Sequence, residues 1–241
     1  MGGYTLSIVI PCYNEKDNIP LLLDGFGRAI GDCSQDSDIL NSIEVVLVDN
    51  GSTDDSAEVI RKLLPCYPFA RTLRVEVNQG YGYGILRGLD SCQSDYIGWT
   101  HADLQTDPGD VIKAYSLLVQ EGVFVKGRRR GRPLSDQFFT NGMSVFESLY
   151  LGARLYDINA QHNIFPRSFY ETWKNPPYDF ALDLYALYQA RRKKLGIVRF
   201  DVDFPERIHG ESKWNHGFGS RLKFIRRTIA FSCRLKKEGI D

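Results

Sequence analysis

The chain has 241 residues, of which 43% are hydrophobic, and its 30 Lys+Arg residues balance 30 Asp+Glu residues. This ordinary globular composition excludes a collagen-like chain, a coiled coil and wholesale disorder. The five cysteines are odd in number and lack CxxC spacing, which argues against a disulfide framework or structural zinc site and indicates reduced thiols in a cytosolic protein.

The first half alternates predicted strands and helices. Four short apolar runs rich in β-branched residues are typical of buried parallel strands: Tyr4–Pro11, Ile43–Asp49, Thr72–Val77 and Tyr96–Thr100. Apolar residues at helical spacing predict helices over Asn18–Ile30 and Asp54–Leu64. This order predicts an α/β fold with a Rossmann-like, mostly parallel sheet and flanking helices, which binds ligands outside the carboxyl ends of its strands.

The pattern changes after Val125. A short strand at Val123–Val125, expected to be the last of the sheet, leads into a basic loop. The elements predicted after it are helices over Gln137–Leu155 and Tyr178–Lys194, a strand over Ile197–Phe204 and a helical tail from Phe218. No signal-peptide pattern opens the chain, and no apolar run approaches the roughly 18 residues of a membrane span.

Charge is divided unevenly between the halves. Residues 1–125 carry 8 Lys+Arg and 18 Asp+Glu, whereas residues 126–241 carry 22 and 12. An acidic half suits a divalent metal and a basic half suits an anionic partner, with solvated helix faces as the plainer alternative. The basic run Lys126–Pro133 is typical of a solvated loop or a nucleic-acid patch. We favour phosphate capture, because the chain has no nucleic-acid-binding motif and its first half is acidic.

Polar residues follow three of the predicted strands. They are Pro11-Cys12-Tyr13-Asn14-Glu15, Asp49-Asn50-Gly51-Ser52-Thr53-Asp54 and His101-Ala102-Asp103-Leu104-Gln105. At such an edge a carboxylate can accept hydrogen bonds from a ribose, an aromatic ring can stack on a base, and a later Asp can hold a metal that bridges two phosphates. The sequence therefore predicts a nucleoside-diphosphate pocket, with a simple turn and helix cap at Asp49–Thr53 as the alternative.

The glycine run Gly80–Gly84 lacks the GxGxxG spacing and the chain position of a dinucleotide site. We expect its glycines to bring the backbone close to a donor at a helix N-terminus, with Arg87 facing the phosphates. In the alternative, Arg87 is a solvated helix residue.

These motifs together resemble the family 2 glycosyltransferases of the GT-A fold, and among them the dolichyl-phosphate mannose synthase-like branch. SIVIPCYNE, VVLVDNGSTDDS, NQGYGYGILRGL, HADLQTDP and RIHGESKW occur in that family's order and approximate spacing. The resemblance implies a catalytic domain over residues 1–215, with a nucleotide-sugar-binding half (1–125) and an acceptor half (126–215), followed by a basic amphipathic helix at 216–241. It implies nucleotide-sugar contacts from Pro11, Tyr13, Glu15, Asp49 and Asp103, and we predict that Gly80, Arg87 and Ala102 complete this set.

The predicted metal site departs from the family pattern. Asp103 matches the metal-binding acid of the DxD motif, but His101 stands where another acid is usual. The predicted ligands of a divalent metal, Mn²⁺ or Mg²⁺, are therefore His101, Asp103 and Gln105, and the imidazole favours Mn²⁺. In the alternatives, His101 contacts ribose or water, or is a packing histidine.

The acceptor side is less explicit. Asp183 falls where the resembling family carries an acid in its acceptor region, so Asp103 and Asp183 are the predicted catalytic residues. Asp183 would act as general base in a single displacement with inversion at the sugar carbon. In the alternative, Asp179 and Asp183 only complement a helix dipole.

A late segment, Arg207–Trp214, resembles the RxxGxSK segment of the polyprenyl-phosphate branch. The resemblance implies phosphate or acceptor contacts from Arg207, Ser212 and Lys213, together with Arg128 of the basic run. In the plainer view the segment is a polar surface loop. Asp157–Arg167 differs from the acceptor-loop pattern of relatives, which leaves the acceptor's identity open.

The tail carries an apolar stripe, interleaved with Arg and Lys, at Phe218, Leu222, Ile225 and Ile229. Such a helix suits a membrane interface beside anionic headgroups. Core packing or a dimer face would use the same stripe.

We therefore expect a metal-dependent, inverting glycosyltransferase. It would move a sugar from a UDP- or GDP-sugar to a polyprenyl phosphate at the cytoplasmic membrane face, as a peripheral protein that binds no nucleic acid and that could form a homo-oligomer. The alternatives are transfer to a hydroxyl of a cell-surface glycan or lipopolysaccharide precursor, a non-catalytic nucleotide-binding protein with a degenerate site, and a nucleotidyltransferase.

Overall fold

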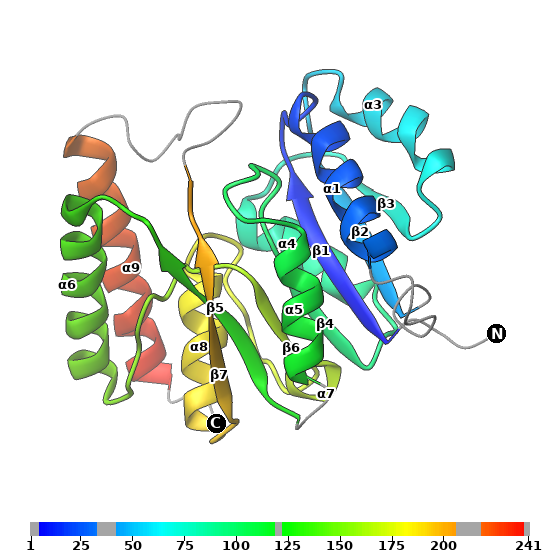
Figure 1. Ribbon diagram of the computed structural model, residues 1–241. Helices are drawn as coiled ribbons and strands as arrows, with labels where there is room; N and C mark the ends of the chain where they lie inside the picture. The colour runs from blue at the N-terminus through cyan, green and yellow to red at the C-terminus, as the bar shows by residue number, and fades with distance from the viewer. Residues whose placement is uncertain (1–4, 33–41, 119–121, 206–217, 239–241) are drawn as a thin grey trace.

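The computed structural model describes residues 5–32, 42–118, 122–205 and 218–238 (Figure 1). Its centre is a seven-stranded sheet in the order β3-β2-β1-β4-β6-β5-β7. The strands are β1 Leu6–Cys12, β2 Ile43–Asn50, β3 Ala70–Val75, β4 Tyr96–Trp99, β5 Phe124–Arg130, β6 Asn163–Pro166 and β7 Ile197–Asp203. The helices are α1 Asn18–Asp32, α3 Ser56–Leu63, η1 Leu64–Cys66, α4 Tyr81–Asp90, α5 Gly109–Leu118, α6 Leu134–Leu151, α7 Arg167–Tyr170, α8 Leu182–Arg192 and α9 Phe218–Glu238.

One strand of the described sheet, β6, runs against the other six. It pairs antiparallel with β4 on one side and β5 on the other, whereas the remaining neighbours pair in parallel. In this register Asn163, the first residue of β6, lies opposite both Trp99 of β4 and Lys126 of β5. The amino end of β6 therefore lies at the same edge as the carboxyl ends of its neighbours, and we call this edge the ligand edge.

Helices cover both faces of the sheet, which explains why its central strands are apolar on both sides. On one face, Ile8 and Ile10 of β1 belong to a buried cluster with residues of α1, α3 and α5. On the other face, Val9 belongs to a second buried cluster with residues of α4, α8 and the end of α9. The carboxyl ends of β1, β2 and β4 lead into loops, which meet at the ligand edge.

Helices α6 and α9 lie side by side beyond the sheet (Figure 1). Ser232 of α9 donates a hydrogen bond of 2.5 Å to Glu147 of α6, and Phe231 and Leu235 are buried in the core. The second part of the tail helix therefore packs on the protein, as the core-packing alternative expects. Of the helices in the described part of the chain, none combines the length and apolar character needed to cross a membrane.

The strands and helices of the first half are confirmed within a few residues. Two expectations for the second half were wrong: the basic segment after Val125 is not a loop but the main part of β5, and β5 is not the last strand of the sheet. Arg128 and Arg130 fit a strand because both pair with Asp201 of neighbouring β7. The short strand β6 and the helix α5 were not predicted.

Candidate functional site

The loops after β1 and β2 are joined to each other at the ligand edge. The side-chain oxygen of Asn14 accepts a hydrogen bond of 2.9 Å from the backbone N–H of Thr53, and the N–H of Asn14 donates to Ser52 Oγ. Asn14 has a φ of 59°, a conformation that Asn tolerates better than most residues. This bridge, which the motif reading missed, sets the positions of Tyr13 and Glu15 on either side of Asn14.

Asp49 lies near the end of β2 and is buried. Its Oδ1 accepts a hydrogen bond of 3.0 Å from the N–H of Ser52, and its Oδ2 accepts one of 3.2 Å from Arg74. Asp49 therefore does stabilise the turn after β2, as the alternative interpretation of Asp49–Thr53 expects. Pro11 is the sixth residue of β1 and pairs with Val48, which brings the β1 and β2 ends together as predicted.

The segment after β4 brings the predicted metal residues close to one another. His101 Nδ1 lies 3.8 Å from Asp103 Oδ2, and Oδ1 of the same carboxylate accepts a bond of 3.2 Å from the N–H of Gln105. The Gln105 amide donates to the carbonyl of Pro205, and Ala102 is buried in the core.

These residues fit a divalent metal in part. Ligands of one ion with bonds of about 2.1 Å lie roughly 3.0–3.4 Å apart, so the imidazole and the carboxylate need only a small approach to share an ion. In the described part of the chain no group of three or more His, Cys, Asp and Glu side chains is gathered. A metal ion bound here would therefore need further coordinating atoms, which Gln105, water or the oxygen atoms of a bound substrate would supply.

The glycine run serves backbone packing between two segments of the protein. Gly80 has a φ of 119°, and a Cβ at Gly82 would lie 2.5 Å from the carbonyl oxygen of Pro177. The N–H of Tyr83 donates to the carbonyl of Tyr178 over 3.0 Å. The backbone of the glycine run therefore does make a close approach, as expected, but the segment that it approaches is the one before α8.

Arg87 is not brought to the ligand edge with the other predicted donor residues. It lies in the last turn of α4, half exposed, and its guanidinium is 3.9 Å from Asp90 of the same helix. Asp90 in turn accepts a hydrogen bond from Tyr170, which follows the carboxyl end of β6 at the opposite edge of the sheet. This placement favours the solvated-helix alternative for Arg87.

Asp183 is buried at the start of α8 and is the centre of a polar network. Its Oδ1 accepts hydrogen bonds of 3.2 Å from Gln161 and 3.1 Å from Asn163. The ammonium of Lys126 lies 3.9 Å from the same oxygen. A carboxylate held among amide donors in this way is aimed and immobile, as a general base must be.

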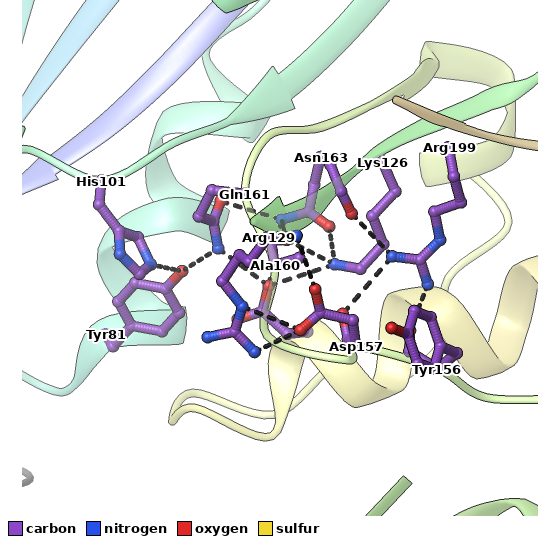
Figure 2. Close-up of polar contacts among 12 residues, drawn as sticks. Tyr81, His101, Lys126, Arg129, Tyr156, Asp157, Ala160, Gln161, Asn163 and Arg199 are labelled. Carbon is purple, nitrogen blue, oxygen red and sulfur yellow. Dashed lines mark hydrogen bonds and ion pairs between the residues drawn. The ribbon is translucent and has the colours of Figure 1, made fainter. Parts of the chain in front are cut away.

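Hydrogen bonds connect this network to the metal residues (Figure 2). The Gln161 amide donates to the hydroxyl of Tyr81 over 3.4 Å, and this hydroxyl lies 2.9 Å from His101 Nε2. The Tyr81 ring stacks on Phe180 with 4.4 Å between centroids. Burial raises the pKa of Tyr81 well above its usual value, and the Asp183 charge adds to this shift, so the phenol stays protonated.

A second ion pair supports the segment before β6. Arg129 donates to both carboxylate oxygens of Asp157, through its backbone N–H and its guanidinium. Burial by itself would raise the pKa of Asp157, but the charge and hydrogen bonds of Arg129 hold it below its usual value. Arg128 pairs with Asp201. Its predicted contact with phosphate stays a prediction.

Three predicted acceptor residues, Arg207, Ser212 and Lys213, lie outside the described residues. The residues that the sequence reading missed are Lys126, Tyr81, Gln161 and Asn163. Gln161 and Asn163 lie in the segment that differs from the usual acceptor-loop pattern, and that difference was the available signal. Tyr81 was visible only as part of the glycine run.

A model of the family described as glycosyl transferase family 2 matches residues 7–184. The chain belongs to glycosyl transferase family 2. The match begins in β1 and ends in the first turn of α8, so it includes the ligand-edge loops and Asp183. The family suggested by the motifs is thus confirmed.

Relatives in glycosyl transferase family 2 are named undecaprenyl-phosphate 4-deoxy-4-formamido-L-arabinose transferase. The chain is 36% identical to the protein from Edwardsiella ictaluri over 226 residues and 26% identical to that from Photorhabdus laumondii over 215 residues. Each match covers 87% of this chain but 62% and 63% of the relative. The chain therefore spans less than two thirds of the length of these relatives.

Solved structures share the fold. Glucosyl-3-phosphoglycerate synthase from Mycobacterium tuberculosis, in complex with Mn²⁺, UDP and glucosyl-3-phosphoglycerate, superposes with a TM-score of 0.71 at 20% identity. The similarity covers 99% of this chain and 81% of that one. The predicted GT-A fold is confirmed.

Proposed function

We propose that the chain catalyses transfer of a sugar from a nucleoside diphosphate sugar to a polyprenyl phosphate. The observation that carries this is the hydrogen-bonded connection, within one sheet edge, between the His101–Asp103 pair and the buried carboxylate of Asp183. A transferase needs a group that meets the leaving diphosphate and a second group that meets the attacking acceptor. The His101–Asp103 end suits the leaving diphosphate, and the Asp183 end suits the attacking acceptor.

The donor end suits a nucleoside diphosphate. Asp49, near the end of β2, and Tyr13, directly after β1, are the proposed contacts for ribose and base, and His101 and Asp103 are the proposed metal ligands. A divalent metal bound there supplies positive charge at the oxygens of the departing diphosphate. The solved relative described above was crystallised with UDP and Mn²⁺, which supports a donor and metal of this class here.

The acceptor end suits a lipid-linked anion. The similar curated proteins carry undecaprenyl phosphate in their names. On α6, Phe138, Val145 and Leu149 are 84%, 59% and 80% exposed, and their spacing places them on one face of the helix. An exposed apolar face beside the basic helix α9 is suited to a membrane interface. We propose peripheral membrane contact through this face.

The experiment is a panel of UDP- and GDP-sugars incubated with Mn²⁺ and with vesicles that do or do not contain polyprenyl phosphate. We expect nucleoside diphosphate release with one donor, and only when the lipid acceptor is present. Metal-dependent nucleotide binding without release would instead favour the non-catalytic alternative.

Leu149→Ser separates membrane contact from chemistry. We expect it to lower release several-fold when the acceptor is in anionic vesicles, and to leave release from a short, soluble polyprenyl phosphate unchanged. If Leu149→Ser released nucleoside diphosphate as fast as the wild type with the acceptor in vesicles, the membrane contact would be contradicted.

His101→Asp tests the metal ligands. Because imidazole nitrogen favours Mn²⁺ over Mg²⁺, we expect the wild type to be faster with Mn²⁺ and the variant to lower the Mn²⁺/Mg²⁺ rate ratio several-fold. Initial rates across a titration of each metal measure this ratio. Asp107→Asn is the control, since Asp107 lies on the same segment but is exposed and accepts a turn bond from the N–H of Gly109, and its ratio should match the wild type. Equal wild-type rates with both metals, and no change in His101→Asp, would contradict ligation by His101.

A further inference from the structure

Lys126 is a fully buried ammonium in the middle of β5. Its side chain has no exposed surface, and its Nζ donates to the carbonyl of Ala160 over 2.9 Å and to Asn163 Oδ1 (Figure 2). Transferring an unpaired ammonium from water to a protein interior is costly, so this cation is held by its oxygen partners. Its place in the sheet is fixed, because Lys126 and Asn163 are register partners on adjacent strands.

The chemistry of Lys126 determines which way the Asn163 amide faces. An ammonium has three donors and no acceptor, so it can bond only to the oxygen of that amide. The Asn163 NH₂ group is therefore turned the other way, where it donates 3.1 Å to Asp183 Oδ1 and 3.0 Å to Gln161 Oε1. With an apolar side chain at position 126, nothing on β5 would oppose a reversal of the amide, which would place its oxygen against the carboxylate.

We propose that Lys126 is a positioning residue, which acts through Asn163 to hold the Asp183 carboxylate correctly aimed. This role rests on the proposed function, in which Asp183 faces the acceptor. Lys126 itself, being buried, does not need to touch substrate.

The charged groups around the ammonium come from every neighbouring element. They are Asp183 of α8, Arg199 of β7, Asp157 before β6 and Arg129 of β5. Burial lowers the pKa of Lys126 to about 7, while Asp183 and Asp157 pull it upward and the two arginines downward. The Lys126 side chain is therefore half protonated at about pH 7, and its positive charge is lost as the pH rises further.

Lys126→Met keeps the chain length and removes the donors. With lipid acceptor, we expect kcat to fall about 10–100-fold while KM for the donor stays within twofold, because the change is at the acceptor carboxylate. Lys62→Met, the same change at an exposed position of α3, should match the wild type.

The effect should pass through Asn163. Asn163→Leu is expected to lower kcat with the same small change in KM for the donor, and the double variant should be no slower than the slower single variant. A loss of kcat that matches the fraction of protein lost to unfolding, read from the melting curve, would show that Lys126 is only structural. Additive losses in the double variant would overturn the route through Asn163.

One measurement needs no activity and so separates this proposal from the proposed function. The side-chain NH₂ resonances of Asn163, assigned by their loss in Asn163→Leu, should exchange slowly with solvent in the wild type and much faster in Lys126→Met. If the wild type shows no transfer but this protection is found, the positioning holds and the proposed function fails. If the protection is equal in both proteins, the positioning is wrong whatever the activity.

Discussion

Replacing Asp103 with Asn is expected to lower kcat about 10²–10³-fold, the usual loss when one charge-stabilising group is removed from an active site. The amide can still accept the bond from the N–H of Gln105, so the local turn should survive. What is lost is the negative charge beside His101, and with it metal affinity. Initial rates of nucleoside diphosphate release at saturating donor, together with a Mn²⁺ binding isotherm, measure both effects.

Asp107→Asn is the matched control for this variant. Asp107 lies on the same segment, is exposed, and accepts a turn bond of 2.9 Å from Gly109 that an Asn oxygen can also accept. Its rate and metal affinity should equal those of the wild type. An Asp103→Asn enzyme with unchanged kcat would remove Asp103 from the proposed mechanism.

Asp183→Asn distinguishes the two kinds of acceptor. A polyprenyl phosphate is already largely ionised at pH 7 and needs little help from a base, so we expect a loss of about 10–100-fold. A hydroxyl acceptor must lose its proton during the reaction, and removal of its base would cost up to about 10⁴-fold. The variant keeps one side-chain oxygen for the Gln161 and Asn163 donors, so the network should persist.

The measurement for Asp183→Asn is single-turnover sugar transfer to polyprenyl phosphate, with donor binding followed separately. Asp179→Asn is the control, because the Asp179 carboxylate accepts a turn bond from the N–H of Ala181 that an Asn oxygen can also accept. A loss above about 10³-fold with normal donor binding would favour the hydroxyl-acceptor alternative.

The strands that build the donor side could be predicted because buried parallel strands leave a strong local pattern. The predicted strand Ile43–Asp49 is apolar at Ile43 and over Val45–Val48 and ends in a carboxylate, so both the strand and the place of Asp49 follow from it. The same reasoning placed His101 and Asp103 at the ligand edge. These predictions need only short stretches of sequence and the general rule for parallel sheets.

The acceptor side could not be predicted in this way, because it depends on contacts between distant segments. Lys126 looks like a surface residue, since lysine is almost never fully buried unless it is paired. Its partners, Ala160 and Asn163, are in position only because β6 enters the sheet in reverse. That strand is four residues long and carries little pattern of its own. Arg87 illustrates the opposite error, in which a basic residue near a motif was assigned to the ligand although the helix carries it to the far edge of the sheet.

The contact between Gly82 and Pro177 has a consequence for motion. It belongs to the same junction as the bond between Tyr83 and Tyr178, and this junction ties the helix after β3 to the segment that leads into α8. A hinge opening between the two halves of the chain would have to break this junction and also the pairing of β4 with β6. We therefore expect the two halves to move as one body, without a hinge opening between them.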